Sequence, residues 1–158
     1  MVKISKDLQI DNTGFTINDT VKEIAQTISL SSANLPADKW QRMTMNDNAY
    51  GNYKNFTVDS NGITIKKGIS QVKISYTIRF DYDSQDTDNI VQSMIRKGDG
   101  SYIWATHLAQ RTFGSQALTS HSGLIVNCKE GDRFELWEWA AKEYHNSRTG
   151  ILIVEKVK

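Results

Sequence analysis

A two-residue alternation of apolar and polar side chains runs through much of this chain and constrains its fold more than any other feature. The clearest example is SQVKISYTIRF, in which every second residue from Val72 to Phe80 is apolar. Successive side chains of a strand point to opposite faces, so this run predicts a strand with one buried face. Turn-forming sequences separate further strand-like runs, at Asn61-Gly62, at 97–100 and at 129–132. Many short strands and almost no helical periodicity predict an all-β sandwich or barrel.

One segment near the N-terminus, INDTVKEIAQTI, has a different spacing. Its apolar residues follow one another at intervals of four, three and four, and Thr20 followed by Glu23 fits a capping box. We therefore expect a short helix over about residues 20–29. A helix of roughly two to three turns is not stable alone in water, so it packs either on its own domain or on other copies of the chain. The residues of this helix seam are Ile17, Val21, Ile24 and Ile28.

Charge, hydropathy and cysteine content exclude several classes of protein. The formal net charge of +1 gives no electrostatic case for binding nucleic acid or a membrane surface. No apolar run approaches the roughly 20 residues that span a bilayer, and the first residues lack the apolar stretch of a secretory signal. The single cysteine, Cys128, lies in the apolar run GLIVNC, where a buried free thiol is expected. We therefore expect synthesis in a reducing cytosol, without membrane insertion and without a nucleic-acid partner.

The order of the strand-like pieces is the next feature. From residue 68 the chain reads GISQVKISYTI, then VQSMIRKGDG, GLIVNCKEGDRFELW and TGILIVEKV. Over about residues 40–158 this series resembles the complement globular-head and tumour-necrosis-factor-like jelly roll. The positions that match the family's glycines and its late turn are Gly68, Gly131, Asp132 and Gly150. The family's usual Asn-Gly in the central turn is replaced here by the sequence KGDG at 97–100.

The resemblance implies a jelly-roll sandwich of two antiparallel sheets that assembles as a homotrimer, with the terminal strand buried between subunits. Ile151 to Val154 are apolar on both strand faces, which suits such a position. Proteins of this fold without a signal peptide occur in bacteriophage tails and baseplates, with an N-terminal attachment segment and a C-terminal head. With Pro36 as the boundary, residues 1–36 would be the attachment segment and residues 37–158 the head. The residues expected at trimer contacts are Trp137, Ile151 and Ile153 in the head, together with Ile17, Val21, Ile24 and Ile28 in the helix.

Catalytic and metal motifs are scarce. The sequence contains neither a nucleophile elbow nor a phosphate loop, and its three histidines lack the paired spacing of a metal site. The loop DYDSQDTDN offers a dense set of carboxylates, which are the ligands that calcium prefers, although ordinary turn chemistry accounts for them equally. We expect no cofactor, with calcium as the single candidate. Its ligands would be Asp81, Asp83, Asp86 and Asp88.

Aromatic side chains carry the main functional signal. In RFELWEW, Trp137 and Trp139 share one strand face, while Phe134 and Leu136 share the other and point into the core. Sugars stack their apolar faces on aromatic rings, but aromatic residues are also enriched at subunit interfaces, which we favour for Trp137. Trp139 and the aromatic residues after it lie nearer a loop, where we expect exposure. The candidate saccharide ligands are Tyr102, Trp104, Trp139, Glu143, Tyr144, His145 and Arg148.

Three functional hypotheses follow from these patterns. The first is a non-enzymatic receptor-binding protein of a phage tail or baseplate, whose trimeric head attaches to host cell-wall saccharide through many weak sites. The second is a structural connector of the same fold that docks another virion protein. The third is a glycan-degrading enzyme. A glycosidase needs a facing pair of carboxylates, whereas Glu135 and Glu138 lie on opposite faces of one strand.

Overall fold

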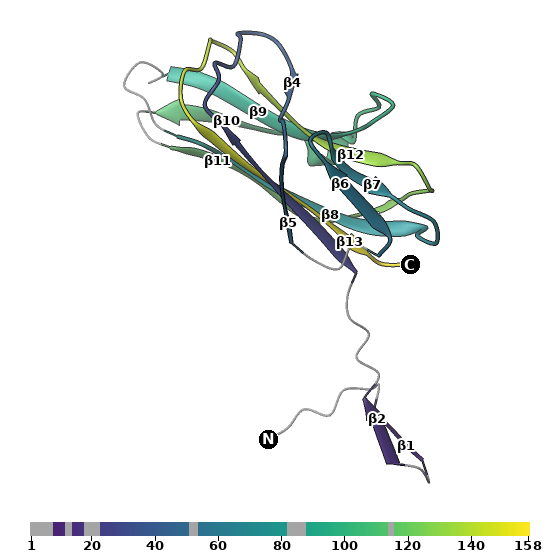
Figure 1. The fold of residues 1–158 in the computed structure, drawn as a ribbon. Coiled ribbons are helices and arrows are strands. Elements are labelled where there is room, and N and C mark those ends of the chain that lie inside the picture. The colour runs from purple at the N-terminus through teal and green to yellow at the C-terminus, as the bar shows by residue number, and fades with distance from the viewer. Residues whose placement is uncertain (1–7, 12–13, 18–22, 51–53, 82–87, 114–115) are drawn as a thin grey trace, which may run out of the picture.

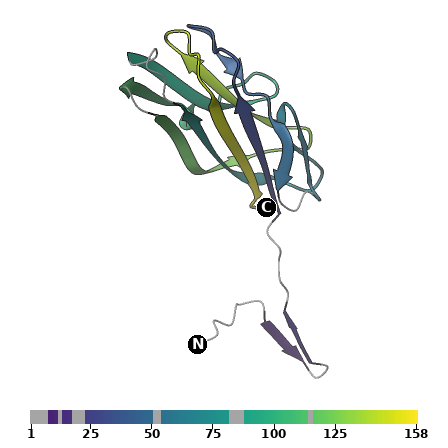
Figure 2. The same cartoon turned by 60° about the vertical axis from the view of Figure 1, so that its left-hand side comes forward.

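The computed structural model describes residues 8–11, 14–17, 23–50, 54–81, 88–113 and 116–158, and these residues form strands with one short 3-10 helix. Two strands, β1 (Leu8–Asp11) and β2 (Gly14–Ile17), pair with each other as a separate two-stranded sheet. The other strands form two larger sheets, which Figures 1 and 2 show as facing layers.

The larger layer is a six-stranded sheet in the order β10-β9-β12-β7-β6, with β4 paired to β12. All of its pairings are antiparallel. Its strands are β4 (Gln41–Arg42), β6 (Phe56–Asp59), β7 (Gly62–Ile65), β9 (Asp88–Lys97), β10 (Leu108–Phe113) and β12 (Arg133–Ala140).

The second layer is a five-stranded sheet in the order β11-β8-β13-β3-β5, also antiparallel throughout. Neighbouring strands such as β3 and β13 are far apart in sequence yet lie side by side in both views. Its strands are β3 (Ile24–Ser31), β5 (Asn46–Tyr50), β8 (Gln71–Phe80), β11 (Ala117–Asn127) and β13 (Arg148–Lys156).

The core lies between the two layers and follows the alternation of the sequence. Every second residue of β8 from Val72 to Phe80 is buried, as the pattern predicts. Phe134 and Leu136 of β12 are fully buried in the same core. The predicted all-β sandwich of two antiparallel sheets is therefore confirmed.

The predicted hairpin around residue 62 is present, with its turn one residue earlier than the sequence suggested. Asp59 pairs with Gly62 across the hairpin, so Ser60 and Asn61 form the turn, and the Asn61 amide donates to an Asp59 carboxylate oxygen at 2.7 Å. Gly62 has a φ of 143°, and a Cβ at this position would lie 2.1 Å from the carbonyl oxygen of Phe134. Only glycine allows β7 to approach β12 this closely.

The predicted helix over residues 20–29 is wrong where the structure describes this segment. Residues from Ile24 onward form β3, which pairs with β13 from Arg148–Ser31 to Glu155–Ile24. A four-residue interval places two side chains on one face of a helix and also on one face of a strand, so the spacing of Ile24 and Ile28 fits both. The strand prevails because it gains a full ladder with β13, which a helix of two turns lacks. Val21 lies outside the described residues.

Small polar residues on the inner face of β3 attach this strand to residues 44–46. Thr27 and Ser29 are buried, and their hydroxyls donate to the backbone carbonyl oxygens of Asn46 and Thr44 at 3.1 and 2.7 Å. The sandwich therefore includes β3, which precedes Pro36, the predicted domain boundary. No helix among the described residues is long and apolar enough to cross a bilayer.

Candidate functional site

The outer face of β9 and β12 presents a row of large polar and aromatic side chains. In the register of these strands, Arg96 lies opposite Glu135, and Met94 lies opposite Trp137. These residues alternate with Ile95 and the buried core residues of β12, so they point away from the core. The face is therefore the reverse side of the six-stranded sheet, as the alternation in RFELWEW predicts.

The segment between β9 and β10 folds back over this face. An isolated bridge pairs Tyr102 with Arg96, and the short helix η1 (Trp104–Thr106) follows. Thr106 fixes the segment because its fully buried hydroxyl accepts from the Ile95 amide at 2.9 Å and donates to the Ile103 carbonyl at 2.7 Å. The loop is thus attached to the β9 backbone on either side of Trp104.

Four side chains stack on one another in a single column, which we call the aromatic stack. From the outside inward its members are Trp104, Tyr102, Arg96 and Trp137. The rings of Trp104 and Tyr102 lie parallel, with centroids 4.9 Å apart and planes inclined by 11°. The guanidinium carbon of Arg96 lies 4.3 Å from the Tyr102 ring centroid and 4.2 Å from that of Trp137. At these distances the cation is attracted to the ring faces on both sides.

The outer end of the aromatic stack is open to solvent, and its centre is closed. Trp104 is 65% exposed and Tyr102 is 45% exposed, whereas Arg96 is 8% exposed. Two nitrogens of Arg96, Nε and Nη2, are buried without a hydrogen-bond partner. Burial lowers the pKa of Arg96 from its ordinary value. The stack therefore presents a rigid aromatic surface above a buried cation.

Two further aromatic side chains support the stack from the side. Trp40 lies 5.1 Å from the guanidinium carbon of Arg96, measured to the ring centroid. His107 contacts Trp40 and Trp104 edge to face, at centroid distances of 5.9 and 6.0 Å. A ring nitrogen of His107 lies 2.8 Å from the side-chain oxygen of Gln92 on β9, which orients the imidazole.

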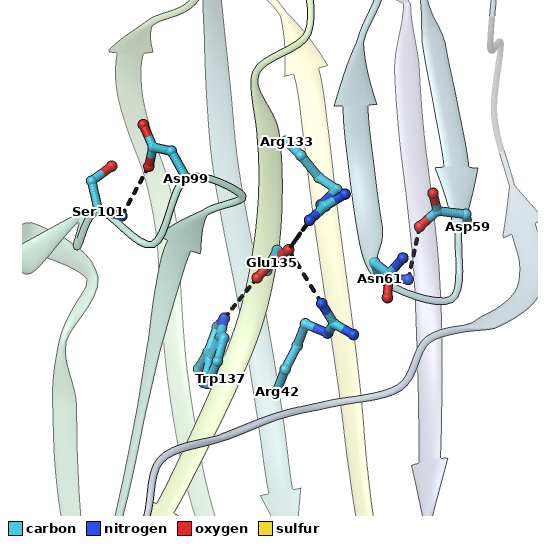
Figure 3. A network of polar contacts seen from close by, with 8 residues as sticks. All are labelled: Arg42, Asp59, Asn61, Asp99, Ser101, Arg133, Glu135 and Trp137. Atoms are coloured by element: carbon cyan, nitrogen blue, oxygen red, sulfur yellow. Dashed lines mark hydrogen bonds and ion pairs between the residues drawn. The ribbon is translucent and has the colours of Figure 1, made fainter.

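A network of polar contacts centred on the Glu135 carboxylate borders the stack through Trp137 (Figure 3). Glu135 is 3% exposed, and its Oε2 accepts from the indole nitrogen of Trp137 at 3.1 Å. Its Oε1 accepts from Arg133 Nη2 at 2.7 Å and lies 3.5 Å from Arg42 Nη1. Glu135 thus fixes the Trp137 ring, and both of its oxygens are used by residues other than Arg96.

The structure brings together some of the predicted saccharide ligands. Tyr102 and Trp104, two of the candidate saccharide ligands, are adjacent, exposed and parallel, and they lie at an isolated bridge and in the short helix η1. Trp137, predicted at a subunit interface, is half-buried within its own chain as the inner member of the aromatic stack. Trp139 is half-buried on the same strand face, opposite Gln92.

Two predicted ligands lie in the interior instead. Tyr144 is 1% exposed, packs edge to face on Phe80 and hydrogen-bonds to the Asp81 carbonyl, so its predicted exposure is wrong. Arg148 is fully buried and donates to Glu138 Oε2 at 2.8 Å, which removes it from any surface site. Tyr144 lies on the segment that joins β12 to β13, where it pairs with Leu35, and Arg148 is the first residue of β13, where it pairs with Ser31.

The remaining predicted ligands lie on the exposed part of the segment that joins β12 to β13, away from the stack. Glu143 is exposed and accepts from the Asn34 side chain at 3.2 Å, and His145 is exposed. Neither Glu143 nor His145 is among the side chains that form or border the aromatic stack.

The acidic loop is described only at its two ends. Asp81 pairs with Arg79 at 2.8 Å, and Asp88 pairs with Arg111 at 2.7 Å. Asp83 and Asp86 lie outside the described residues. Within the described ranges no three of His, Cys, Asp and Glu come close enough together to hold a metal ion.

A second surface of interest is the outer face of the five-stranded sheet. Ile151 of β13 lies directly opposite Ile28 of β3, and both side chains are only partly buried. Ile24 and Ile153 lie on the same face and are also partly buried. The large apolar side chains most exposed on it are Leu30 (67%), Leu118 (54%) and Ile125 (55%). Ile17, the other described member of the predicted seam, ends β2.

Sequence reasoning missed Arg96 and Trp40 as members of the site. Arg96 ends the strand-like run NIVQSMIR on the same face as Gln92 and Met94, which is a signal that it points outward. No comparable signal exists for Trp40, which reaches the site from an extended segment. Their contact with Tyr102 depends on how the β9–β10 segment folds back, which strand periodicity does not encode.

Comparison with known proteins places the fold. No protein-family model and no curated protein sequence matches this chain. Among solved structures, the PRD1 vertex protein P5 matches with a TM-score of 0.61 and 14% identity, over 100% of this chain and 86% of that one. The globular domain of zebrafish complement 1qA matches with a TM-score of 0.49 and 12% identity, over 84% and 95% of the two chains. The cyanophage Pam1 capsid matches with a TM-score of 0.47 and 11% identity, over 89% of each chain.

The first of these likenesses supports the predicted fold. It extends over the whole chain, and the two-sheet antiparallel arrangement is the jelly roll that the order of sequence motifs predicts. At 14% identity the likeness establishes the fold alone. The features that bear on function are the aromatic stack and the exposed apolar residues of the five-stranded sheet.

Proposed function

We propose that this chain is a non-enzymatic phage virion protein of the tail or baseplate, whose trimeric head attaches the particle to a saccharide on the host cell surface. The observation that carries the proposal is the exposed, parallel pair Trp104 and Tyr102, held from below by Arg96 and Trp137. An aromatic ring fixed in this way offers a flat apolar surface on which the apolar face of a sugar ring can stack.

Rigidity of the platform supports a binding role. A ligand that binds a preformed surface does not have to order it, so more of the contact energy contributes to affinity. The Thr106 hydrogen bonds and the Arg96 contacts hold the loop before any ligand arrives. A single stacked sugar binds weakly, and three such sites on one trimer would add avidity.

Assembly as a homotrimer is supported by the outer face of the five-stranded sheet. Leu30, Leu118 and Ile125 are each more than half exposed on this face. Ile28 and Ile151, paired across β3 and β13, add apolar area next to Leu30. An apolar surface of this kind is covered in many proteins by copies of the same chain. In the proposed particle the residues ahead of β3 form the attachment segment to another virion protein.

A virion role is supported by the fold shared with the PRD1 vertex protein P5. A non-enzymatic role is supported by the carboxylates of β12. Glu135 and Glu138 lie on opposite faces of the strand, and each is engaged by arginine side chains. Carboxylates held this way do not form the facing acid and base pair that glycoside hydrolysis requires.

Binding of fluorescently labelled protein to intact host cells and to their purified cell-wall polysaccharide tests the proposal. Trp104→Ala is expected to reduce binding at least tenfold, since the sugar loses its stacking surface. Ile90→Ala is the matched control, because Ile90 is exposed on the same strand face six residues from Arg96, on the order of 20 Å away. The control should bind as the unmodified protein does.

The outcomes separate the competing functions. Protein that ignores cells and polysaccharide but co-purifies with another virion protein would replace the receptor-binding role by a connector role. Progressive shortening of the polysaccharide during incubation would identify an enzyme. Binding that persists unchanged in Trp104→Ala would move the site away from the aromatic stack.

A further inference from the structure

The buried guanidinium of Arg96 points to the chemical class of the ligand. Its Nε and Nη2 have no hydrogen-bond partner, although buried polar groups in proteins are nearly always paired. Stacking between Tyr102 and Trp137 engages the two faces of the guanidinium plane. The N–H groups, however, lie in that plane and point outward from its edge. The ring contacts therefore leave the hydrogen-bonding edge of Arg96 unused.

The neighbouring carboxylate, that of Glu135, does not accept hydrogen bonds from the edge of Arg96. Glu135 lies opposite Arg96 in the strand register, yet its oxygens accept from Arg133, Arg42 and Trp137. Arg96 therefore has a carboxylate beside it but no ion pair with it.

Positively charged side chains border the stack. Arg42 and Arg133 lie beside it together with Arg96, and the carboxylate in direct contact with the first two is that of Glu135. Asp59 and Asp99 lie on neighbouring turns, where they accept from the Asn61 and Ser101 amides (Figure 3). The Arg42 and Arg133 side chains are 38% and 31% exposed, so their charge reaches solvent beside the stack.

On the basis of the proposed saccharide-binding function, we infer that the saccharide is anionic: its carboxylate or phosphate group binds the guanidinium edge of Arg96 while a neighbouring sugar ring of the same chain stacks on the outer face of Trp104. A guanidinium binds both kinds of oxyanion through parallel N–H donors. Nη1 is the nitrogen of Arg96 that the protein does not enclose, so it makes the first contact.

An array of purified polysaccharides and oligosaccharides provides the test. Uronate-containing glycans are printed beside their carboxyl-reduced forms, and phosphate-containing glycans beside their dephosphorylated forms. The expected result is binding of the unmodified protein to acidic glycans, with a loss of about tenfold or more on the neutral counterpart. Whether uronate or phosphate spots bind identifies the source of the oxyanion.

Two variants and a salt series locate the interaction. Arg96→Met keeps the apolar length of the side chain but removes the cation, so it should bind acidic and neutral counterparts equally. Lys67→Gln, which removes an exposed positive charge at the β7–β8 turn, should retain the preference. Binding of the unmodified protein to acidic glycans should weaken as sodium chloride is raised, because salt screens the attraction between exposed charges. This last measurement does not depend on whether Arg96→Met folds.

The possible results distinguish the anionic inference from the proposed binding of a saccharide. Equal binding to acidic and neutral counterparts, abolished by Trp104→Ala, overturns the anionic inference and leaves saccharide binding in place. A preference for acidic glycans that Arg96→Met retains also overturns it, by placing the anion elsewhere. Binding to none of the glycans overturns it as well, and the cell-binding experiment then decides the proposed function separately.

Discussion

At the residue scale, the buried ion pair of Arg148 and Glu138 is an interaction whose loss is costly for stability. Both side chains are buried, and Arg148 also donates to the Ala33 and Asn146 carbonyls at 2.8 and 2.9 Å and to the Ser31 hydroxyl at 3.1 Å. It therefore joins the segment after β3 to the start of β13. Breaking a buried pair is costly because the remaining charge stays in the interior without a partner.

Arg148→Ala is accordingly expected to lower the free energy of unfolding by about 3–5 kcal/mol. Chemical denaturation followed by tryptophan fluorescence measures this change. The double variant Arg148→Met with Glu138→Leu removes both charges and should recover most of the loss. A single variant as stable as the unmodified protein would mean that the ion pair contributes little.

A second residue-scale prediction concerns Tyr76, whose hydroxyl lies 2.7 Å from the Thr106 carbonyl and 2.9 Å from the Ser93 hydroxyl. Burial raises the pKa of Tyr76 to about 12 from its ordinary value of 10.0. The folded state therefore holds this proton more tightly than the unfolded state. Stability from this group is fully present below pH 10 and is lost as pH rises towards 12, by up to about 1.4 kcal/mol per pH unit. Tyr76→Phe should flatten this alkaline decline in denaturation curves measured between these pH values.

At the element scale, the β9–β10 segment decides whether the aromatic stack exists. Thr106→Val keeps the shape of the side chain but removes the hydroxyl that binds Ile95 and Ile103. The buried Ile95 amide would be left without a partner, at a cost of about 1–3 kcal/mol. We expect faster proteolysis within residues 98–107 and weaker saccharide binding, with the oligomeric state unchanged. Thr57→Val, an exposed threonine of β6, is the matched control.

Strands with a strict alternation could be predicted from the sequence, and those with ambiguous spacing could not. β8 alternates residue by residue, so its buried face follows directly from the letters. In β12 the letters predict the inward positions of Phe134 and Leu136 but not the burial of Glu138 on the same face. The spacing in β3 fits helix and strand equally, and the choice depends on β13, which lies far along the chain. The site was predictable as far as Tyr102 and Trp104. Arg96 and Trp40 join them through tertiary contacts that no local pattern records.

At the scale of the whole molecule, the exposed sheet predicts association. Light scattering of the purified protein should give about three times the chain mass of 17.9 kDa. Ile151→Lys places a charge at the centre of the proposed contact, opposite Ile28, and should yield monomers. Thr64→Lys on the other sheet is the control and should leave trimers intact. A monomer for the unmodified protein would contradict the proposed assembly.

The pairing of β3 with β13 also affects how the chain folds during synthesis. Ser31 lies opposite Arg148, so a ribosome must add 148 − 31 = 117 residues before this contact can start to form. Contacts between such distant residues slow folding, since a long loop has to close before they stabilise anything. During synthesis the edge of β3 that pairs with β13 therefore stays unpaired until β13 has been translated, and an unpaired strand edge can associate with other chains.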